Sequence, residues 1–344
     1  MPADSSVIIR ENFPLKDHNT FSISAKAKYF TEIETTEQLK EIFSSEQFKN
    51  EHKLILGGGS NLLFTKDFDG LVIKNNLKGI EKIYENNDYA LLKVGAGENW
   101  HEFVLSSIKE NLSGIENLSL IPGTVGAAPM QNIGAYGVEI KDVFYSLEAF
   151  DIATGEIKEF LKDECNFGYR ESIFKKELKG KYIIVSVTFK LSKNHKINIS
   201  YGAIKDTLTE MNIANPTIKD VSDAVSYIRS TKLPDPKVIG NAGSFFKNPE
   251  IDQNHFQVLK EKYPDIVSYP IDENKVKIPA GWLIEKAGWK GKTFENYGVH
   301  KNQALVLVNY GEAKGEQINN LADQIQTSIF NDFGIKLDKE VNII

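Results

Sequence analysis

Residues 121–137 read IPGTVGAAPMQNIGAYG, a stretch in which glycine and alanine crowd the positions between Gly123 and Gly137. Small residues at this density remove side-chain bulk along a long backbone segment. Such a backbone suits a flat aromatic group or a pyrophosphate that lies against main-chain amides. Taken alone, a glycine-rich loop packed against a neighbouring element explains the composition equally well.

A second glycine-rich segment precedes it. The short apolar strand KLIL, residues 53–56, leads directly into GGGSN, residues 57–61. Glycines at the end of a strand let the backbone approach a ligand closely, and consecutive amides can form an anion-binding nest. The pattern is not G-x-G-x-x-G and no helix pattern follows at once, so a Rossmann site is not supported. A simple tight turn is the competing interpretation.

Three further polar side chains stand in unusual surroundings. Ser244 lies in NAGSFFKNP, residues 241–249, which is neither G-x-S-x-G nor placed near an obvious histidine base. Arg170 ends CNFGYR and can hold a carboxylate or a phosphate through two parallel hydrogen bonds. Glu340 lies in the closing segment LDKEV. Read singly, these are a turn serine, a surface salt-bridge partner and a strand-face carboxylate.

Composition excludes several classes of protein. The 344 residues carry 41 Lys and Arg against 47 Asp and Glu, a net charge of -6 that gives no general reason to bind nucleic acid. The single cysteine, Cys165, excludes an intramolecular disulfide and a cysteine-based zinc site. The six histidines show no metal-ligand spacing, so we expect no metal.

We expect a cytoplasmic protein that does not enter membranes. Residues Met1 to Arg10 lack a basic region followed by an apolar stretch, so no secretory signal is visible. The longest apolar runs, at 182–189 and 304–308, are far too short to cross a bilayer.

The order of the expected elements favours an α+β fold over a doubly wound sheet, because strands and helices do not alternate strictly. Pro234 and Pro236 cannot continue the helix before them and mark a domain boundary. Hydrophobic periodicity predicts helices at about 36–48 with Thr36 as N-cap, 100–109, 252–262, 280–287 and 315–333. It predicts strands at 53–56, 70–74, 182–191, 304–309 and 335–344, with hairpins at 80–94 and 143–160.

Each motif is a weak signal alone, but the order of the motifs along the chain is specific. GGGSN, IPGTVGAAPMQNIGAYG, YRESIFK, KLPDP, NAGSFFKNP, AGWLIE and LDKEV resemble the UDP-N-acetylenolpyruvoylglucosamine reductase family, also called the UDP-N-acetylmuramate dehydrogenases. The resemblance runs from about residue 14 to the C-terminus. Ser-Tyr-Gly at 200–202 and the extra stretch up to Ala280-Gly281-Trp282 resemble its longer subtype. The N-terminal half alone would indicate only the wider vanillyl-alcohol-oxidase-like FAD-binding superfamily.

The resemblance implies a flavoprotein of three parts. These are residues 1–79 with 333–344, residues 80–230, and a substrate-binding part at 231–332; the first two would hold FAD non-covalently. Family members often carry Ser where this chain has Ala127 and Ala128, so a hydroxyl contact to the flavin would be missing. The implied cofactor contacts are Gly57, Gly58, Gly59, Ser60, Asn61, Pro122, Gly123, Thr124, Gly126, Ala127, Asn132, Gly134, Ala135, Tyr136 and Gly137.

The resemblance also implies the reaction. NADPH would reduce FAD at N5, and the hydride would pass to the vinyl carbon of UDP-N-acetylglucosamine enolpyruvate, giving UDP-N-acetylmuramate for peptidoglycan synthesis. Ser244 would protonate the resulting enolate, and Arg170 and Glu340 would stabilise it. The implied enzyme is a monomer that acts on small molecules. Its substrate contacts would be Tyr201, Lys232, Asn248, Tyr269 and Gln303.

Two other functions remain open at this point. A related FAD-dependent oxidase would pass its electrons to oxygen and would consume oxygen without the enolpyruvyl substrate. A non-catalytic nucleotide-sugar-binding protein would be colourless and would not bind added FAD. The joint presence of Arg170, Ser244 and Glu340 argues against the second of these.

Overall fold

The computed structural model describes residues 6–344 and divides into two compact units. The first unit comprises the residues up to Phe13, Ala27–Gly58 and Asp69–Ser230; the second comprises Pro14–Lys26, Gly59–Phe68 and Thr231–Ile344. Residues 1–5, which belong to the segment used in the localisation argument, lie outside the described residues. The three-part division expected from the sequence stays a prediction.

A four-stranded sheet opens the chain, in the order β1 (Arg10–Pro14), β2 (Lys26–Ile33), β5 (Phe68–Asn75) and β3 (His52–Leu56). β3 and β5 run parallel, and Leu56 pairs with Lys74. The expected strands at 53–56 and 70–74 are confirmed as parts of β3 and β5. The sequence analysis did not anticipate β1 and β2.

Helix α1 (Thr36–Ser44) packs Leu39 and Ile42 into the core beside this sheet. Thr35, not Thr36, is its N-cap: the Thr35 backbone is extended, and its hydroxyl accepts from the Gln38 amide at 3.3 Å. The Gln38 side chain completes a capping box. The single helix expected over 36–48 is also wrong, because α1 ends at Ser44 and a separate 3₁₀ turn covers Glu46–Phe48.

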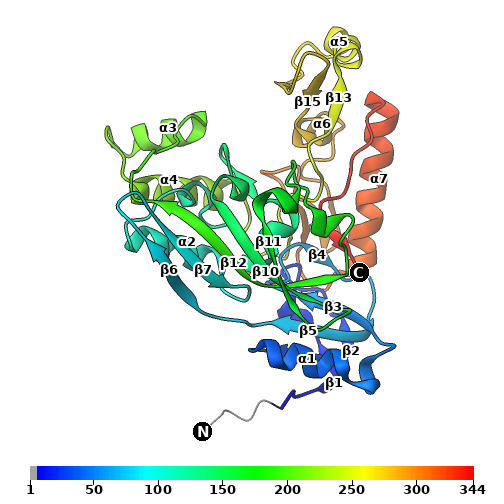
Figure 1. The fold of residues 1–344 in the computed structure, drawn as a ribbon. Helices are drawn as coiled ribbons and strands as arrows, with labels where there is room; N and C mark the ends of the chain where they lie inside the picture. The colour runs from blue at the N-terminus through cyan, green and yellow to red at the C-terminus, as the bar shows by residue number, and fades with distance from the viewer. Residues whose placement is uncertain (1–5) are drawn as a thin grey trace. The chain divides into compact units, whose positions relative to one another are not determined.

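A five-stranded antiparallel sheet forms the main core of the first unit. Its order is β11 (Ile157–Leu161), β10 (Phe144–Asp151), β12 (Tyr182–Ser192), β7 (Tyr89–Gly95) and β6 (Ile80–Glu85). Both expected hairpins are confirmed. Helix α2 (Trp100–Lys109) covers the sheet (Figure 1), and the Trp100 and Phe103 rings pack against Phe189 of β12.

Two more helices complete the first unit. α3 (Gly202–Glu210), which the sequence analysis missed, and α4 (Ile218–Lys232) share an apolar cluster that includes Ile204, Leu208 and Val225. α4 ends directly before the prolines expected to stop it. A short hairpin of β8 (Gly134–Ala135) and β9 (Val138–Glu139) begins in the glycine-rich stretch and ends directly after it.

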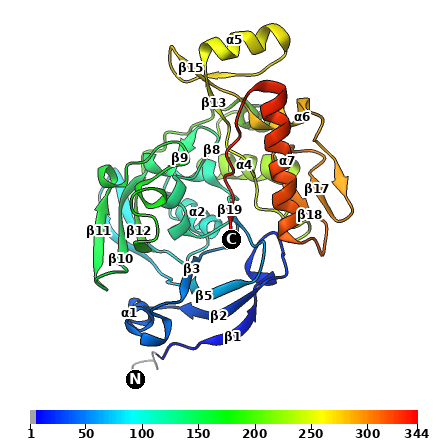
Figure 2. The same cartoon turned by 90° about the vertical axis from the view of Figure 1, so that its right-hand side faces the viewer.

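The second unit consists of small sheets and helices (Figure 2). One sheet orders β13 (Glu250–Asp252), β15 (Lys275–Lys277) and β14 (Tyr269–Pro270); another orders β16 (Thr293–Phe294), β17 (Tyr297–Val299) and β18 (Leu307–Asn309). The helices are α5 (Gln253–Lys262), α6 (Ala280–Lys286) and α7 (Gly315–Phe333). The expected bounds of α7 are confirmed, and Gly334 ends it in the left-handed region at φ 67°.

The strand expected over 335–344 is wrong in its length. Only β19 (Asn342–Ile343) is a strand, and it pairs in parallel with β4 (Leu62–Leu63). The residues before it are extended but bond elsewhere: the Lys247 amide donates to the Asp338 carbonyl at 2.9 Å. Because its backbone groups are shared among separate loops, the segment forms no continuous ladder.

The mixture of antiparallel sheets, the parallel pairs β3–β5 and β4–β19, and packed helices confirms the α+β class. Among residues 6–344, no helix combines the length and the apolar character needed to cross a membrane.

Candidate active site

The two glycine-rich segments expected to hold a ligand touch each other in the first unit. A Cβ added to Gly57 would lie 2.6 Å from Thr124 Oγ1, and one added to Gly58 would lie 2.8 Å from Gly123 Cα. The contact at Gly58 is with backbone, so glycine is required there for packing alone, whereas at Gly57 the Thr124 side chain would have to move. The glycines therefore bring two separate loops into contact, and any larger residue would push them apart.

These loops present amide groups that the protein itself does not use. Within residues 6–344, the structure records no acceptor for the backbone N–H of Gly58, Gly123 or Thr124. By contrast, the Gly123 carbonyl accepts from the Trp100 amide at 3.1 Å, and the Gly57 carbonyl accepts from the Lys74 ammonium. Neighbouring amides without protein acceptors are the donor set that binds a phosphate group. The residues present thus fit the diphosphate of a dinucleotide.

The remainder of GGGSN belongs to the second unit. Gly59 has φ 64°, and a Cβ there would lie 2.1 Å from the His18 carbonyl oxygen, so glycine is required. Ser60 follows it, and the Asn61 side-chain amide donates to the Glu340 carbonyl at 3.2 Å. The end of the first glycine-rich motif is therefore tied to the C-terminal segment that carries Glu340.

Asn132 fixes the middle of the 122–137 stretch. It is buried and left-handed at φ 44°, its side-chain amide donates to the Gly168 carbonyl at 3.0 Å, and its Oδ1 accepts from the Lys141 amide at 3.1 Å. The other expected contacts lie on either side of Asn132. Pro122 precedes the short 3₁₀ turn that contains Gly126 and Ala127. Ala135 lies in β8, and Tyr136 and Gly137 follow it. Asn132 thereby joins the glycine-rich stretch to the segment before Arg170.

Arg170 lies beside the same stretch. Its Nη2 donates to the Gly134 carbonyl at 2.7 Å, and its own backbone is left-handed at φ 55°. This conformation costs about 1–2 kcal/mol in a residue with a side chain, and such strain persists where the surrounding structure enforces it. The structure therefore brings Arg170 and the expected cofactor loop together within the first unit.

Ser244 and Glu340 lie on neighbouring backbone segments of the second unit. The Glu340 amide donates to the Phe245 carbonyl at 2.8 Å, and Ser244 forms an antiparallel bridge with Val306. Phe245 is fully buried and anchors the segment, while Gly243 turns the chain at φ 69° directly before Ser244. Two residues almost a hundred positions apart in the sequence are thus brought to one place.

Two of the expected substrate contacts gather at the start of α6. Asn248 Oδ1 accepts from the Ala280 amide at 2.9 Å, and a Cβ on Gly281 would lie 3.5 Å from Gln303 Oε1. Tyr269 lies apart on β14 with its side chain exposed, and Lys232 is the last residue of α4.

Tyr201 belongs to the first unit, where its exposed ring packs edge-on against Tyr136 with centroids 5.2 Å apart. Behind this pair lies Arg229 of α4, which the sequence analysis missed. Arg229 Nε donates to the Leu120 carbonyl at 3.2 Å, and its guanidinium interacts with the Tyr136 hydroxyl. Burial raises the pKa of Tyr136 and lowers the pKa of Arg229. No sequence pattern marks Arg229, because it is one of several polar residues on an amphipathic helix.

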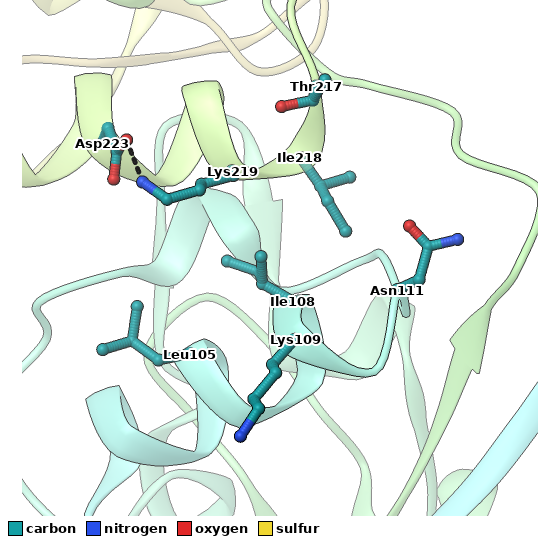
Figure 3. Close-up of a pocket in the computed structure, with 8 residues that line it drawn as sticks. All are labelled: Leu105, Ile108, Lys109, Asn111, Thr217, Ile218, Lys219 and Asp223. Carbon is teal, nitrogen blue, oxygen red and sulfur yellow. Dashed lines mark hydrogen bonds and ion pairs between the residues drawn. The ribbon is translucent and has the colours of Figure 1, made fainter.

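A surface pocket of about 420 Å³ lies elsewhere in the first unit, between α2 and the start of α4 (Figure 3). Leu105, Ile108 and Ile218 form its apolar part, and the ion pair of Lys219 with Asp223 lies at its rim. Its lining contains none of the residues that the sequence analysis selected.

The α+β fold and the glycine-rich cradle, formed by the backbone amides of Gly58, Gly123 and Thr124, fit a protein that binds a dinucleotide. Residues 27–161 match the family described as FAD binding domain. Residues 235–344 match the family described as UDP-N-acetylenolpyruvoylglucosamine reductase, C-terminal domain. A relative named UDP-N-acetylenolpyruvoylglucosamine reductase from Flavobacterium johnsoniae is 56% identical over 98% of this chain and 99% of its own. One of the same name from Amoebophilus asiaticus is 52% identical, again over 98% and 99%. The chain belongs to the UDP-N-acetylenolpyruvoylglucosamine reductase family.

A solved structure shares the fold. It is the UDP-N-acetylenolpyruvylglucosamine reductase of Thermus caldophilus, with a TM-score of 0.67, 24% identity and 98% of each chain covered. The family resemblance expected from the motif order is thereby confirmed, and FAD is confirmed as the cofactor class of the N-terminal half.

Proposed function

We propose that this protein reduces UDP-N-acetylglucosamine enolpyruvate to UDP-N-acetylmuramate, with NADPH as the electron donor. The near-full-length identity to relatives of that name carries the proposal. The juxtaposition of Ser244 and Glu340 supports it independently, because a protonating hydroxyl and a carboxyl group are the groups that the second half of the reaction needs.

When bound, FAD supplies the hydride that reaches the substrate. The chain would hold its diphosphate with the backbone amides of Gly58, Gly123 and Thr124, which have no recorded acceptor among the described residues 6–344. The proposed contacts are those of residues 57–61 and 122–137 already named, from Gly57 to Asn61 and from Pro122 to Gly137. Alanine at Ala127 and Ala128 leaves these positions without hydroxyl donors.

Arg170 would bind the substrate carboxylate. Hydride addition to the vinyl carbon leaves negative charge on the carbon that bears this carboxylate, and charge-assisted bonds to a guanidinium strengthen as that charge grows. The contact between Arg170 Nη2 and the Gly134 carbonyl fixes the side chain beside the cofactor loop. Arg170 is therefore oriented before the substrate enters.

Ser244 would donate its Oγ proton to the substrate carbon, because a carbanion is a far stronger base than the serine alkoxide. Solvent then returns the proton to Oγ, and Lys232 or Asn248 would stabilise the alkoxide in the interval. Glu340 would stabilise the intermediate by hydrogen bonding at the substrate carboxylate, next to the segment that carries Ser244.

Tyr201 would close over the substrate and exclude water. Its ring already packs on Tyr136 at the end of the cofactor loop, so closure and cofactor binding share one contact. Lys232, Asn248, Tyr269 and Gln303 would bind the diphosphate and the sugar. The protein would be a cytoplasmic monomer that acts on small molecules and needs neither nucleic acid nor a membrane.

The variant Ser244→Ala separates the two half-reactions. We expect NADPH to reduce the bound flavin at the wild-type rate, and reoxidation by the enolpyruvyl substrate to slow by about 10²–10⁴, the usual contribution of a general acid. Anaerobic stopped-flow absorbance measures both phases. Ser328→Ala on α7 serves as the control and should leave both unchanged. Wild-type reoxidation in Ser244→Ala would remove Ser244 from the proton-donating role.

A further inference from the structure

Lys74 is a half-buried cation that no motif in the chain includes. It lies on β5 opposite Leu56 of β3, and its ammonium donates to the carbonyl of Gly57, the first residue of the glycine-rich turn. Burial lowers the pKa of Lys74, and the nearby charge of Lys78 lowers it further, whereas Glu32 raises it. Within residues 6–344, no carboxylate lies at ion-pair distance from its ammonium.

Among residues 6–344, no carboxylate balances the charge of the Lys74 ammonium. Burying an ammonium is costly unless an anion or several hydrogen bonds compensate it. Here one recorded carbonyl bond does so. The Gly57 carbonyl is therefore the group on which the charge of the Lys74 ammonium acts.

The bond also controls the peptide that follows. The Gly57 carbonyl and the Gly58 amide belong to the same peptide group, and in a trans peptide the two point in opposite directions. When Lys74 holds the carbonyl, the Gly58 N–H is fixed on the other side, and the structure records no acceptor for that N–H within residues 6–344. A cationic donor on the carbonyl also polarises the peptide and strengthens the N–H as a donor.

We propose that Lys74 is a positioning residue for the cofactor: it orients the Gly57–Gly58 peptide so that the Gly58 amide donates to a phosphate oxygen of FAD. The inference rests on the proposed function, because that function assigns FAD to this cradle. It assigns Lys74 no contact with the reacting atoms. Lys74 acts on affinity through the peptide it holds.

Lys53 provides a matched control within the same sheet. It lies on β3, its ammonium donates to the Phe48 carbonyl and at 3.2 Å to the Glu51 carbonyl, and burial likewise lowers its pKa. It therefore reproduces the chemistry of a half-buried lysine bound to backbone carbonyls. What it lacks is the connection to the glycine-rich turn.

The test compares Lys74→Met and Lys53→Met in the full-length protein stripped of FAD. The dissociation constant is measured by quenching of FAD fluorescence, and the thermal midpoint is measured without FAD. We expect Lys74→Met to weaken FAD binding roughly ten-fold, the size of one charge-assisted hydrogen bond, and Lys53→Met to change it less than two-fold. If Lys74→Met does not fold, Lys74→Gln replaces it, with weaker FAD binding again expected.

The proposal is overturned if wild type and the Lys74 variant bind FAD equally well while both lysine variants lower the thermal midpoint alike. Lys74 would then stabilise the fold only and would not affect FAD binding. A wild-type protein that fails to bind FAD would overturn the proposed function itself. The two failures are therefore distinguishable.

Discussion

Gly58 has two roles. Its lack of a side chain lets two loops meet, and its amide has no recorded acceptor in the described part of the chain, residues 6–344. We expect Gly58→Ala to lower the free energy of unfolding by about 1–3 kcal/mol, because the new methyl group would overlap the Gly123 backbone. FAD affinity should fall with it. Denaturant unfolding and FAD titration measure the two effects.

Gly202→Ala is the control, because a Cβ there meets nothing within 4 Å and the residue begins α3. Its unfolding free energy should be unchanged or slightly higher, since alanine favours a helix. Equal unfolding free energies for Gly58→Ala and Gly202→Ala would contradict the packing described for the cradle.

Cys165 is a buried thiol whose pKa is raised to about 12, first by burial and second by the charge of Glu164. A raised thiol pKa means that the folded protein stays protonated where the unfolded chain ionises. Between about pH 9 and pH 12 this group therefore favours unfolding more strongly as the pH rises.

We expect native Cys165 to resist a thiol-specific chromogenic reagent at pH 8, and one thiol to react fully once the chain is unfolded in guanidinium. Counting released chromophore gives the result. Rapid reaction of the native protein, at the rate of the unfolded chain, would show that the side chain is accessible and its thiolate available.

At the scale of single residues, the sequence predicted site residues that lie in recognisable motifs. It did not predict residues that come close to the site only when the chain folds. Ser244 and Glu340 stand in distinctive segments, and the fold places those segments side by side. Lys74 and Arg229 stand in ordinary strand and helix patterns. Their contacts, with the Gly57 carbonyl and with the Tyr136 hydroxyl, depend on pairings far along the chain that composition does not encode.

Helix α7 is the longest helix and shows how strongly one apolar face determines an element. Ile325 is fully buried, whereas Phe330 on the same helix is 58% exposed. We expect Ile325→Ala to lower the free energy of unfolding by about 2–5 kcal/mol, and Phe330→Ala to change it by less than about 0.5 kcal/mol. Chemical denaturation followed by circular dichroism measures both, and similar losses in the two variants would contradict the assigned orientation.

Among the elements, the helices with a clear hydrophobic period and a clear end were predicted with the bounds that the structure shows. α2 and α7 have strong apolar faces, and Gly334 ends α7. α3 was missed because it is short and mostly polar. The strand expected over 335–344 failed because alternation in sequence predicts an extended chain but not a partner. This segment divides its backbone hydrogen bonds among Lys247, Phe245 and Asn61.

At the scale of the whole molecule, the sequence predicted the family and its cofactor class from the order of seven motifs, and the near-full-length matches confirm both. The partition of the chain was harder to anticipate. GGGSN is divided between the two compact units after Gly58, and residues 59–68 join the C-terminal part. No composition shift marks that point, because the change arises from the pairing of β4 with β19.

The central claim is that this chain passes electrons from NADPH through FAD to an enolpyruvyl nucleotide sugar. An anaerobic absorbance titration of the FAD-loaded protein tests it most directly, with NADPH added first and UDP-N-acetylglucosamine enolpyruvate second. We predict that NADPH bleaches the visible flavin band and that one equivalent of substrate restores it. Bleaching that only air reverses would identify an oxidase, and a protein that stays colourless with added FAD would contradict the account altogether.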